Sequence, residues 1–370
     1  MTGAFRPELQ GLRAAAVGGV LAFHLLPAVF PAGFLGVDVW RSLLVVLLVL
    51  YATAGGLLLA LKRNAVSLES PLPKAKEAEA LQLAERLWGE RDAPRPMAPA
   101  EVLRVNKRLA YLRPICRRPN GRLPTRAGRG GAEWTCVERG SGSREVVVLG
   151  NSIAFTAFVG VVRAFRPLAR RVSLLSLRSC VPAPVDRQQS NLSAARKRNC
   201  AAFLAAAQRA LRQWERPIDV VISLFGYNTI EDPPITSGDP WLGFLNAFYG
   251  NLSAVAREAV IVPGLTPFFP RHPLRLVHER LTARRPVGED QLAHLPHIRR
   301  RLERIHCNRC LRVDWIAAWC GGGRPQCAAA DPRGVLTFFD QHHPSLVGAI
   351  RMGELLRDVY VRHKNRRLIE

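Results

Sequence analysis

Three polar residues of this sequence have the types and the order of a nucleophile and its proton-transfer partners. The first, Ser152, follows a short apolar run and the pair Gly150-Asn151, a pattern that predicts a strand, a tight turn and a serine at the start of a helix. Backbone N–H groups point outward at that place, and the helix dipole favours negative charge. The position therefore suits a nucleophile whose reaction develops an oxyanion. The alternative is that Ser152 only caps the helix.

The other two residues, Asp340 and His343, lie three positions apart just before the last predicted helix. In a turn, this spacing lets the carboxylate reach the imidazole, fix its tautomer and support its charged form. His343 would then take the hydroxyl proton of Ser152 as general base and return it to a leaving group. His342 competes for this role, and we prefer His343 because Asp-x-x-His before a helix has a defined register. A polar helix start in which Asp340 merely caps is the alternative.

A further candidate, Asn228, ends the triplet Gly226-Tyr227-Asn228 after the apolar run 220–224. Its side-chain amide is expected to donate a hydrogen bond to the oxyanion, beside the backbone N–H of Ser152. An ordinary turn residue is the alternative at this position.

The elements that must position these residues alternate between strand and helix from residue 145 onward. Apolar runs bounded by turns predict strands, and longer amphipathic stretches predict the helices between them. The alternation predicts an α/β fold with a parallel sheet flanked by helices, and substrate at the carboxyl ends of the strands. The predicted strands are 146–149, 172–177, 220–224, 259–262 and 311–315, and the predicted helices are 153–165, 192–214, 242–257, 291–305 and 344–361.

In combination, these motifs resemble the SGNH (GDSL-like) hydrolase superfamily. The resemblance rests on Gly150-Asn151-Ser152 after a first strand, on the Gly-x-Asn after a central strand and on Asp340-x-x-His343 before the last helix. The usual Gly-Asp-Ser is Gly-Asn-Ser here, which leaves the nucleophile in place. The glycine of that family's second block is not identified in the sequence.

The first 63 residues contain two apolar segments. Residues 14–34 are apolar apart from His24 and two prolines, and we predict a membrane helix there, with a secretory signal peptide as the alternative. Residues 42–61 have the length of a bilayer core and predict a transmembrane helix. A histidine inside lipid is costly and therefore indicates a function, whereas a position near the membrane interface is the alternative.

This region resembles the opening of membrane acyltransferase-3 proteins, many of which carry an SGNH domain after their last membrane helix. Arg13 and His24 have the spacing of that family's Arg-x10-His motif, and the cysteine layout around Cys307-x-x-Cys310 is similar to the nematode O-acyltransferase-like branch. The family has many more membrane helices than the one or two predicted here. We therefore interpret residues 1–63 as a remnant of the acyltransferase-3 domain, 64–143 as an irregular stem and 144–365 as the SGNH domain.

Eight cysteines fall as four neighbouring pairs along the chain, which indicates disulfides and an oxidising compartment. One pair, Cys116 and Cys136, would close a loop within the stem. A zinc site made by the last four cysteines is the alternative. Two sequons, at Asn191 and Asn251, fit a lumenal or extracellular domain. The cysteines are Cys116, Cys136, Cys180, Cys200, Cys307, Cys310, Cys320 and Cys327.

The formal net charge is +24, from 53 Lys+Arg against 29 Asp+Glu. Such a balance is common in nucleic-acid-binding proteins, but the arginines are scattered and no nucleic-acid-binding motif is present. We therefore predict no nucleic-acid partner and a basic surface that faces an anionic membrane or an acidic glycan.

The resemblance implies an O-acyltransferase that passes an acyl group, most simply acetyl, to an extracytoplasmic glycan or lipid hydroxyl through an acyl-serine. It implies membrane localisation with a lumenal or extracellular SGNH domain. It implies no metal and no tightly bound cofactor, with an acetyl-CoA-like donor where the full membrane domain is present. A membrane-tethered esterase and a non-catalytic lumenal scaffold are the alternatives. The implied site residues are Ser152, His343, Asp340 and Asn228, with Arg13 and His24 as remnants of the membrane acyl-transfer site.

Overall fold

The computed structural model describes residues 74–91, 97–110, 132–188, 192–227, 230–285, 287, 290–292, 295–320 and 326–367. The chain divides into two compact units, Met1–Pro73 and Lys74–Glu370, and only the second contains described residues. Arg13, His24 and both predicted membrane segments therefore lie outside the described residues. Within the ranges given above, no helix combines the length and the apolar character needed to cross a bilayer.

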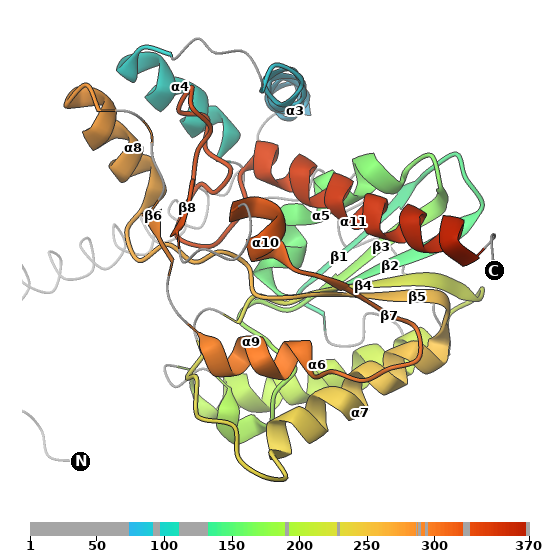
Figure 1. Ribbon diagram of the computed structural model, residues 1–370. Helices are drawn as coiled ribbons and strands as arrows, with labels where there is room; N and C mark the ends of the chain where they lie inside the picture. The colour runs from blue at the N-terminus through green and yellow to red at the C-terminus, as the bar shows by residue number, and fades with distance from the viewer. Residues whose placement is uncertain are drawn as a thin grey trace, which may run out of the picture. The chain divides into compact units, whose positions relative to one another are not determined.

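A six-stranded sheet forms the centre of the second unit (Figure 1), and this confirms the predicted α/β fold with a mostly parallel sheet. The strand order is β1-β3-β2-β4-β5-β7, in which β1 runs antiparallel to β3 and all other neighbours are parallel. The chain goes from β2 to β3 on one side and then crosses to β4 on the other. The end of β2 is thus a switch point of the topology, where such sheets bind ligands. The strands are β1 Trp134–Arg139, β2 Arg144–Gly150, β3 Ala169–Ser176, β4 Ile218–Leu224, β5 Ala256–Pro263 and β7 Cys310–Val313.

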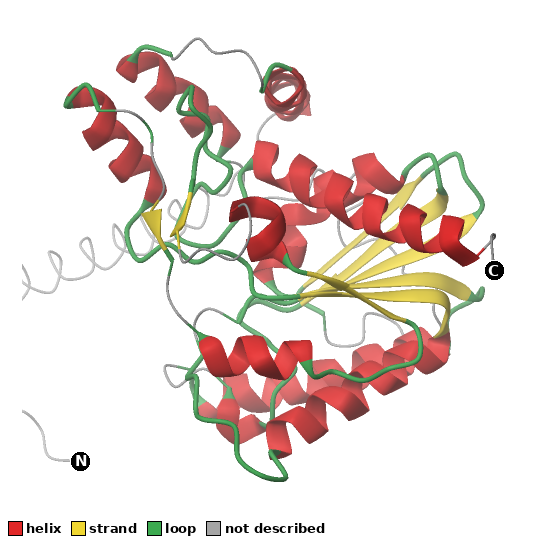
Figure 2. Cartoon of the chain, in the orientation of Figure 1, coloured by secondary structure: helices red, strands yellow, loops and turns green. Residues whose placement is uncertain are grey.

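Helices cover both faces of the sheet (Figures 1 and 2). One face carries α5 (Ser152–Phe165) and α11 (Leu346–Arg367), and the other carries α6 (Ala194–Arg212), α7 (Pro240–Val255) and α9 (Pro296–Glu303). Strands buried on both faces need nearly continuous apolar sequence, which is why β2 contains an unbroken run from Val146 to Leu149.

Two glycines let α5 and α11 approach each other closely. A Cβ on Gly160 would overlap the backbone of Ala349, and a Cβ on Gly353 would overlap the backbone of Gly160. Because α5 begins at Ser152 and α11 follows His343 by three residues, this tight helix pair fixes the relative positions of two predicted site residues.

Part of the predicted stem belongs to the folded unit, so the stem prediction is corrected where the structure describes it. Helix α3 (Lys74–Gly89) buries Ala84 and Leu87 in a cluster that includes Ile350 of α11. Helix α4 (Pro99–Leu109) packs beside α8 (Pro273–Thr282). The sheet begins at β1 rather than after residue 144, because β1 forms a full antiparallel ladder with β3.

The last predicted strand, 311–315, is shorter than expected. Strand β7 ends at Val313, and Trp315 begins the short helix α10 (Trp315–Cys320). The side chain of Asp314 accepts a hydrogen bond from the backbone N–H of Ala317, which caps the new helix. A small two-stranded sheet pairs β6 (Asp290–Gln291), which follows α8 in the chain, with β8 (Gln326–Cys327), which follows α10.

Disulfides join Cys180 to Cys200, Cys307 to Cys310 and Cys320 to Cys327. These pairings confirm the predicted disulfides between neighbouring cysteines and exclude the zinc alternative, because the four sulfur atoms proposed as ligands are bonded in pairs. Cys136 is also disulfide-bonded, while Cys116 lies outside the described residues.

Candidate active site

The turn after β2 is held by the residue before the serine. The side-chain oxygen of Asn151 accepts hydrogen bonds from the backbone N–H groups of Ile153 and Gly226, both at 3.1 Å. The amide nitrogen of Asn151 donates to the carbonyl of Gly226 at 3.0 Å. Asn151 is therefore the N-cap of α5, and Ser152 is its first helical residue. The capping alternative for Ser152 is wrong, and its hydroxyl remains available for other partners.

The glycine before this pair is required by the neighbouring strand. A Cβ on Gly150 would overlap the carbonyl of Leu224, the last residue of β4. The two strand ends approach each other this closely because Asn151 N–H also donates to the carbonyl of Leu224, at 3.2 Å. Any larger residue at position 150 would displace the turn that presents Ser152.

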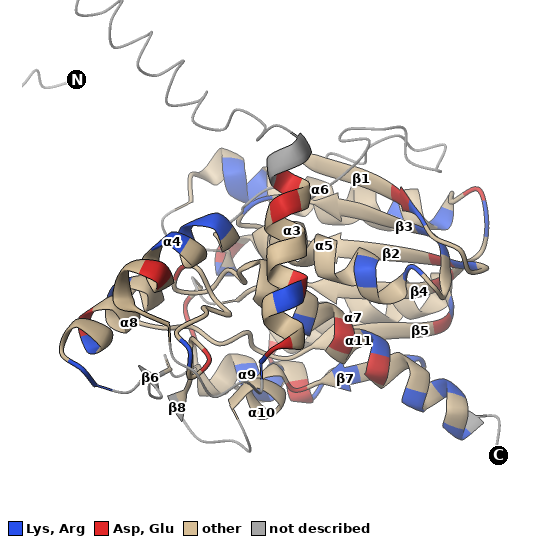
Figure 3. Cartoon of the chain, turned by 90° about the horizontal axis from the view of Figure 1, so that it is seen from above, with Lys and Arg blue, Asp and Glu red and all other residues tan. Residues whose placement is uncertain are grey.

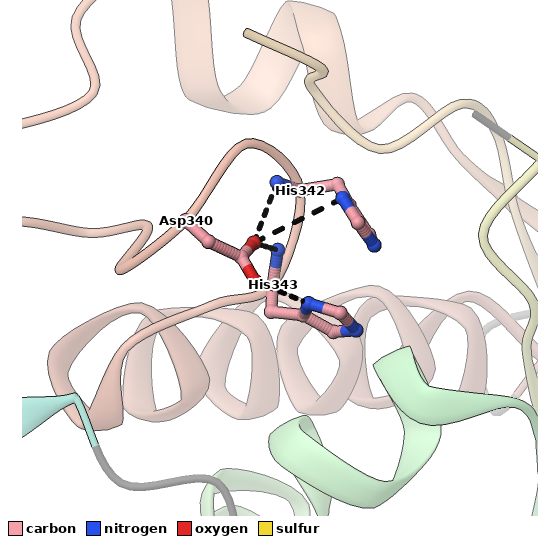
Figure 4. A group of neighbouring side chains, drawn as sticks. All are labelled: Asp340, His342 and His343. Atoms are coloured by element: carbon pink, nitrogen blue, oxygen red, sulfur yellow. Dashed lines mark hydrogen bonds and ion pairs between the residues drawn. The ribbon is translucent and has the colours of Figure 1, made fainter. Parts of the chain in front are cut away.

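Ser152, His343 and Asp340 form a continuous chain of hydrogen bonds. The Nε2 atom of His343 lies 2.8 Å from the Oγ atom of Ser152. The Nδ1 atom of His343 lies 2.7 Å from Oδ2 of Asp340 (Figure 4). A carboxylate can only accept, so the hydrogen-bond pattern assigns the proton to Nδ1 and leaves Nε2 to accept the hydroxyl proton of Ser152. This is the arrangement of a nucleophile, a general base and an orienting acid.

Asp340 is positioned by its own turn, independently of its contact with the His343 ring. Its Oδ1 atom accepts hydrogen bonds from the backbone N–H groups of His342 at 2.9 Å and His343 at 2.7 Å. The Phe339 ring stacks on the His343 imidazole with an interplanar angle of 10°. The loop is further tied to the segment after β5, because Phe269 N–H donates to the carbonyl of Gln341 at 2.8 Å.

Asp340 is ionised at neutral pH. Burial alone would raise its pKa, but the hydrogen bond and charge of His343 and the two backbone N–H groups lower the pKa to about 2. A carboxylate held in this state stabilises the imidazolium that forms when His343 accepts a proton.

His342, the competing candidate, points elsewhere. Its ring lies 4.0 Å from the His343 ring and 5.9 Å from the Phe268 ring. Burial, and then the charge of His343, lower its pKa to about 4, so it is neutral at neutral pH. Its Nδ1 atom is 3.9 Å from Oδ1 of Asp340 (Figure 4) and makes no hydrogen bond with a described residue. The geometry therefore favours His343 as the base.

The same loop offers three atoms that a metal ion could use. One ligand atom from each of Asp340, His342 and His343 lies within 4.8 Å of the others. Two of these side chains are already paired with each other, and the His343 ring contacts Ser152 through its other nitrogen. This connection to a hydroxyl gives the cluster the geometry of proton transfer.

The predicted oxyanion donor Asn228 lies outside the described residues, although Gly226, Tyr227 and Ile230 near it are described. Gly226 is bonded to Asn151, and Tyr227 is buried with its carbonyl accepting from Ile230 N–H at 3.3 Å. This segment follows β4, the strand next to β2.

Sequence reasoning missed an unusual turn after β3, the strand that pairs with β2 on the side away from β4. The turn after β3 places Ser179 at a φ of 58°, a left-handed conformation that favours glycine. Its backbone N–H makes no hydrogen bond with any residue that the structure describes. The signal is weak in sequence, because a serine gives no indication of a left-handed backbone.

Comparison with protein families matches residues 115–358 to the family described as "SGNH domain (fused to AT3 domains)". No curated protein matches the chain. The family match spans more than half of the chain and includes Ser152, Asp340 and His343. From this match and from the hydrogen-bonded site at the end of β2, we conclude that the chain belongs to the family of SGNH domains that are fused to AT3 domains.

Proposed function

We propose that this protein transfers an acyl group, most simply acetyl, to a hydroxyl of an extracytoplasmic glycan or lipid through an acyl-serine. The observation that carries the proposal is the unbroken chain of hydrogen bonds from Asp340 through His343 to Ser152. It lies after β2 at the carboxyl end of a parallel sheet. The family supports esterase or acyltransferase chemistry in general, and transfer to a glycan is the finer step that we propose.

In the first half-reaction, Oγ of Ser152 attacks the acyl carbonyl while its proton passes to Nε2 of His343. Asp340 stabilises the resulting imidazolium, which then protonates the leaving group as the tetrahedral intermediate collapses to the acyl-serine. We assign the oxyanion to the backbone N–H group of Ser152 and to the amide of Asn228. In the second half-reaction, the acceptor hydroxyl gives its proton to His343 and attacks the acyl-serine carbonyl. As the ester bond to Ser152 breaks, His343 returns that proton to Oγ of Ser152.

The cell compartment belongs to the same proposal. Three disulfides among the described residues support an oxidising compartment outside the cytosol. The sequons add less, because Asn251 lies within helix α7 and Ser253 of its triplet is buried, whereas acceptor sequons are expected in surface loops. Asn191 lies outside the described residues. A membrane location, an acetyl-CoA-like donor and roles for Arg13 and His24 are parts of the proposal that follow from the family resemblance.

A membrane-tethered esterase is the second candidate, and the exposure of the site favours it. The side chains of His343 and Asp340 are 16% and 28% exposed, so water can reach the base. In that case, water replaces the acceptor hydroxyl in the second half-reaction.

Two measurements test the proposal. A fluorophosphonate probe should label the wild-type chain and leave Ser152→Ala unlabelled, with Ser141→Ala as the control because Ser141 is an exposed serine outside the site. Equal labelling of wild type and Ser152→Ala would sink the catalytic proposal and favour a scaffold. With an activated acetyl ester as donor, addition of a glycan acceptor should yield O-acetylated glycan. Release of acetate with no acetylated product would support the esterase.

A further inference from the structure

A pocket of about 470 Å³ lies between the segment that follows β5 and helix α8. Its lining begins at Phe269 and Pro270, in the segment after β5, and continues along α8. This volume is within the range of pockets that bind small ligands such as a sugar unit.

Backbone contacts connect this pocket to the catalytic loop. The N–H of Phe269 donates to the carbonyl of Gln341, and the Gln341 amide donates to the carbonyl of Pro270, both at 2.8 Å. One residue earlier, the Phe268 ring contacts the ring of His342. A ligand in the pocket would therefore contact Phe269 and Pro270, which are hydrogen-bonded to the loop that holds the general base.

The charged side chains of the lining are mostly positive. They are three arginines, Arg271, Arg280 and Arg285, and one glutamate, Glu279. The glutamate is already paired, because Arg271 donates to it at 2.6 Å and Arg275 donates to it at 2.9 Å. The side chain of Arg285 forms no ion pair with any residue in the described ranges. Among the described residues, the pocket thus contains at least one guanidinium, that of Arg285, that its own carboxylate does not neutralise.

The end of α8 explains how two of the arginines come together. Arg284 has a φ of 54°, and this left-handed residue turns the chain back on the helix. The N–H of Arg285 then donates to the carbonyl of Arg280 at 2.8 Å, as in a Schellman cap. Figure 3 shows the basic turn that leaves α8. The cap places both side chains on the rim of one pocket.

We propose that this pocket binds an anionic group, a carboxylate or phosphate, of the acceptor that receives the acyl group. Guanidinium groups pair with such oxyanions in a planar, two-pronged geometry, which suits recognition of an acidic sugar or of a phosphorylated headgroup. The inference rests on the proposed function only in identifying the ligand as the acyl acceptor. The binding of an anion can be measured without turnover.

The test uses the full-length chain with Ser152→Ala, so that no reaction accompanies binding. Methyl glucuronide, methyl glucoside and glycerol 1-phosphate are titrated and followed by ligand-observed NMR. We expect the glucuronide to bind at least about tenfold more tightly than the neutral glucoside, and the difference to shrink in about 0.5 M salt. Tighter binding of glycerol phosphate than of glucuronide would identify the phosphorylated headgroup as the source of the anion.

The matched variants separate this pocket from general basic charge. Arg280→Gln with Arg285→Gln should weaken glucuronide binding about tenfold, because each exposed charge pair contributes modestly. Arg170→Gln with Arg212→Gln removes two exposed arginines at the opposite end of the sheet and should leave binding unchanged. Equal binding of glucuronide and glucoside, or equal loss in both double variants, would overturn the proposal.

Probe labelling keeps the two proposals distinct. In the background that retains Ser152, the Arg170→Gln and Arg212→Gln double variant, which lies outside the pocket, should react with a fluorophosphonate at the wild-type rate. If the wild-type chain is not labelled at all, the proposed function is refuted. The titration then still decides whether the pocket binds an anion.

Discussion

Replacing Asp340 with asparagine tests whether the carboxylate oxygen that faces Nδ1 of His343 is needed for reactivity. The Oδ1 atom of the new side chain can still accept from the backbone N–H groups of His342 and His343, so the turn should survive. At the other position, an NH₂ group would face Nδ1 of His343 in place of a carboxylate oxygen. Two donors cannot pair, so the imidazole should adopt the tautomer with its proton on Nε2. That tautomer cannot accept the proton of Ser152.

The size of the effect has an electrostatic part and a tautomeric part. The pKa of Asp340 falls from 3.8 to about 2, and a shift of this size corresponds to about 2 kcal/mol that favours the charged carboxylate beside His343. Loss of the reactive tautomer adds to this. The corresponding substitution in a known Ser-His-Asp triad lowers turnover about 10⁴-fold. We expect a loss of similar order here, which equals about 5.5 kcal/mol in the activation barrier.

The assay is the second-order rate of fluorophosphonate labelling, together with hydrolysis of a p-nitrophenyl ester. Circular dichroism and urea unfolding confirm that the variant is folded. The matched control is Asp358→Asn, which makes the same chemical change at an exposed aspartate on α11 and should keep the wild-type rate. A folded Asp340→Asn protein that retains more than about a tenth of the wild-type rate would refute the triad reasoning.

Three further predictions concern single positions. In the wild type, the free energy of unfolding should fall by up to about 3 kcal/mol as the pH is lowered from 6.5 to 4. The reason is that His342 binds a proton in this range in the unfolded state but not in the folded state, where its pKa is about 4. Urea titrations of His342→Phe should show a smaller fall, and the variant should still be labelled by the probe. Arg301→Leu should lower the free energy of unfolding by about 3–5 kcal/mol, because it leaves a buried carboxylate unpaired, whereas Arg300→Leu at an exposed site should have little effect. Arg284→Gly should raise the free energy of unfolding by up to about 1 kcal/mol, because the backbone there is left-handed, and a urea titration should show this as a higher midpoint; an unchanged or lower midpoint would contradict this.

Much of the central fold could be predicted because its strands and helices have strong local patterns. The run 146–149 is apolar throughout and ends at Gly150-Asn151, so both the strand and the turn were readable, and the structure has β2 ending at Gly150. The Asp-x-x-His spacing was readable for the same reason, because the hydrogen bonds that position Asp340 are made within its own turn.

The features that escaped prediction depend on partners that are distant in sequence. Strand β1 has polar and charged residues, and it is a strand because β3 supplies its ladder. Helix α4 looked like part of a stem, but Val102 packs against Val277 of α8, which is remote in the chain. The pocket beside α8 could not be predicted from the sequence either, because its arginines come together only once the left-handed turn at Arg284 has formed.

The asparagine that departs from the usual Gly-Asp-Ser sequence acquires a physical meaning in the structure. Its amide accepts from Gly226 N–H and donates to the Gly226 carbonyl, so it pairs with that backbone as another peptide group would. An aspartate could accept, but its second oxygen would face the Gly226 carbonyl and repel it. Asn151 thus joins the turn that presents Ser152 to the segment that leads to Asn228. The same side chain therefore sets the nucleophile and one side of the proposed oxyanion site in register, which a glycine or alanine at position 151 could not do.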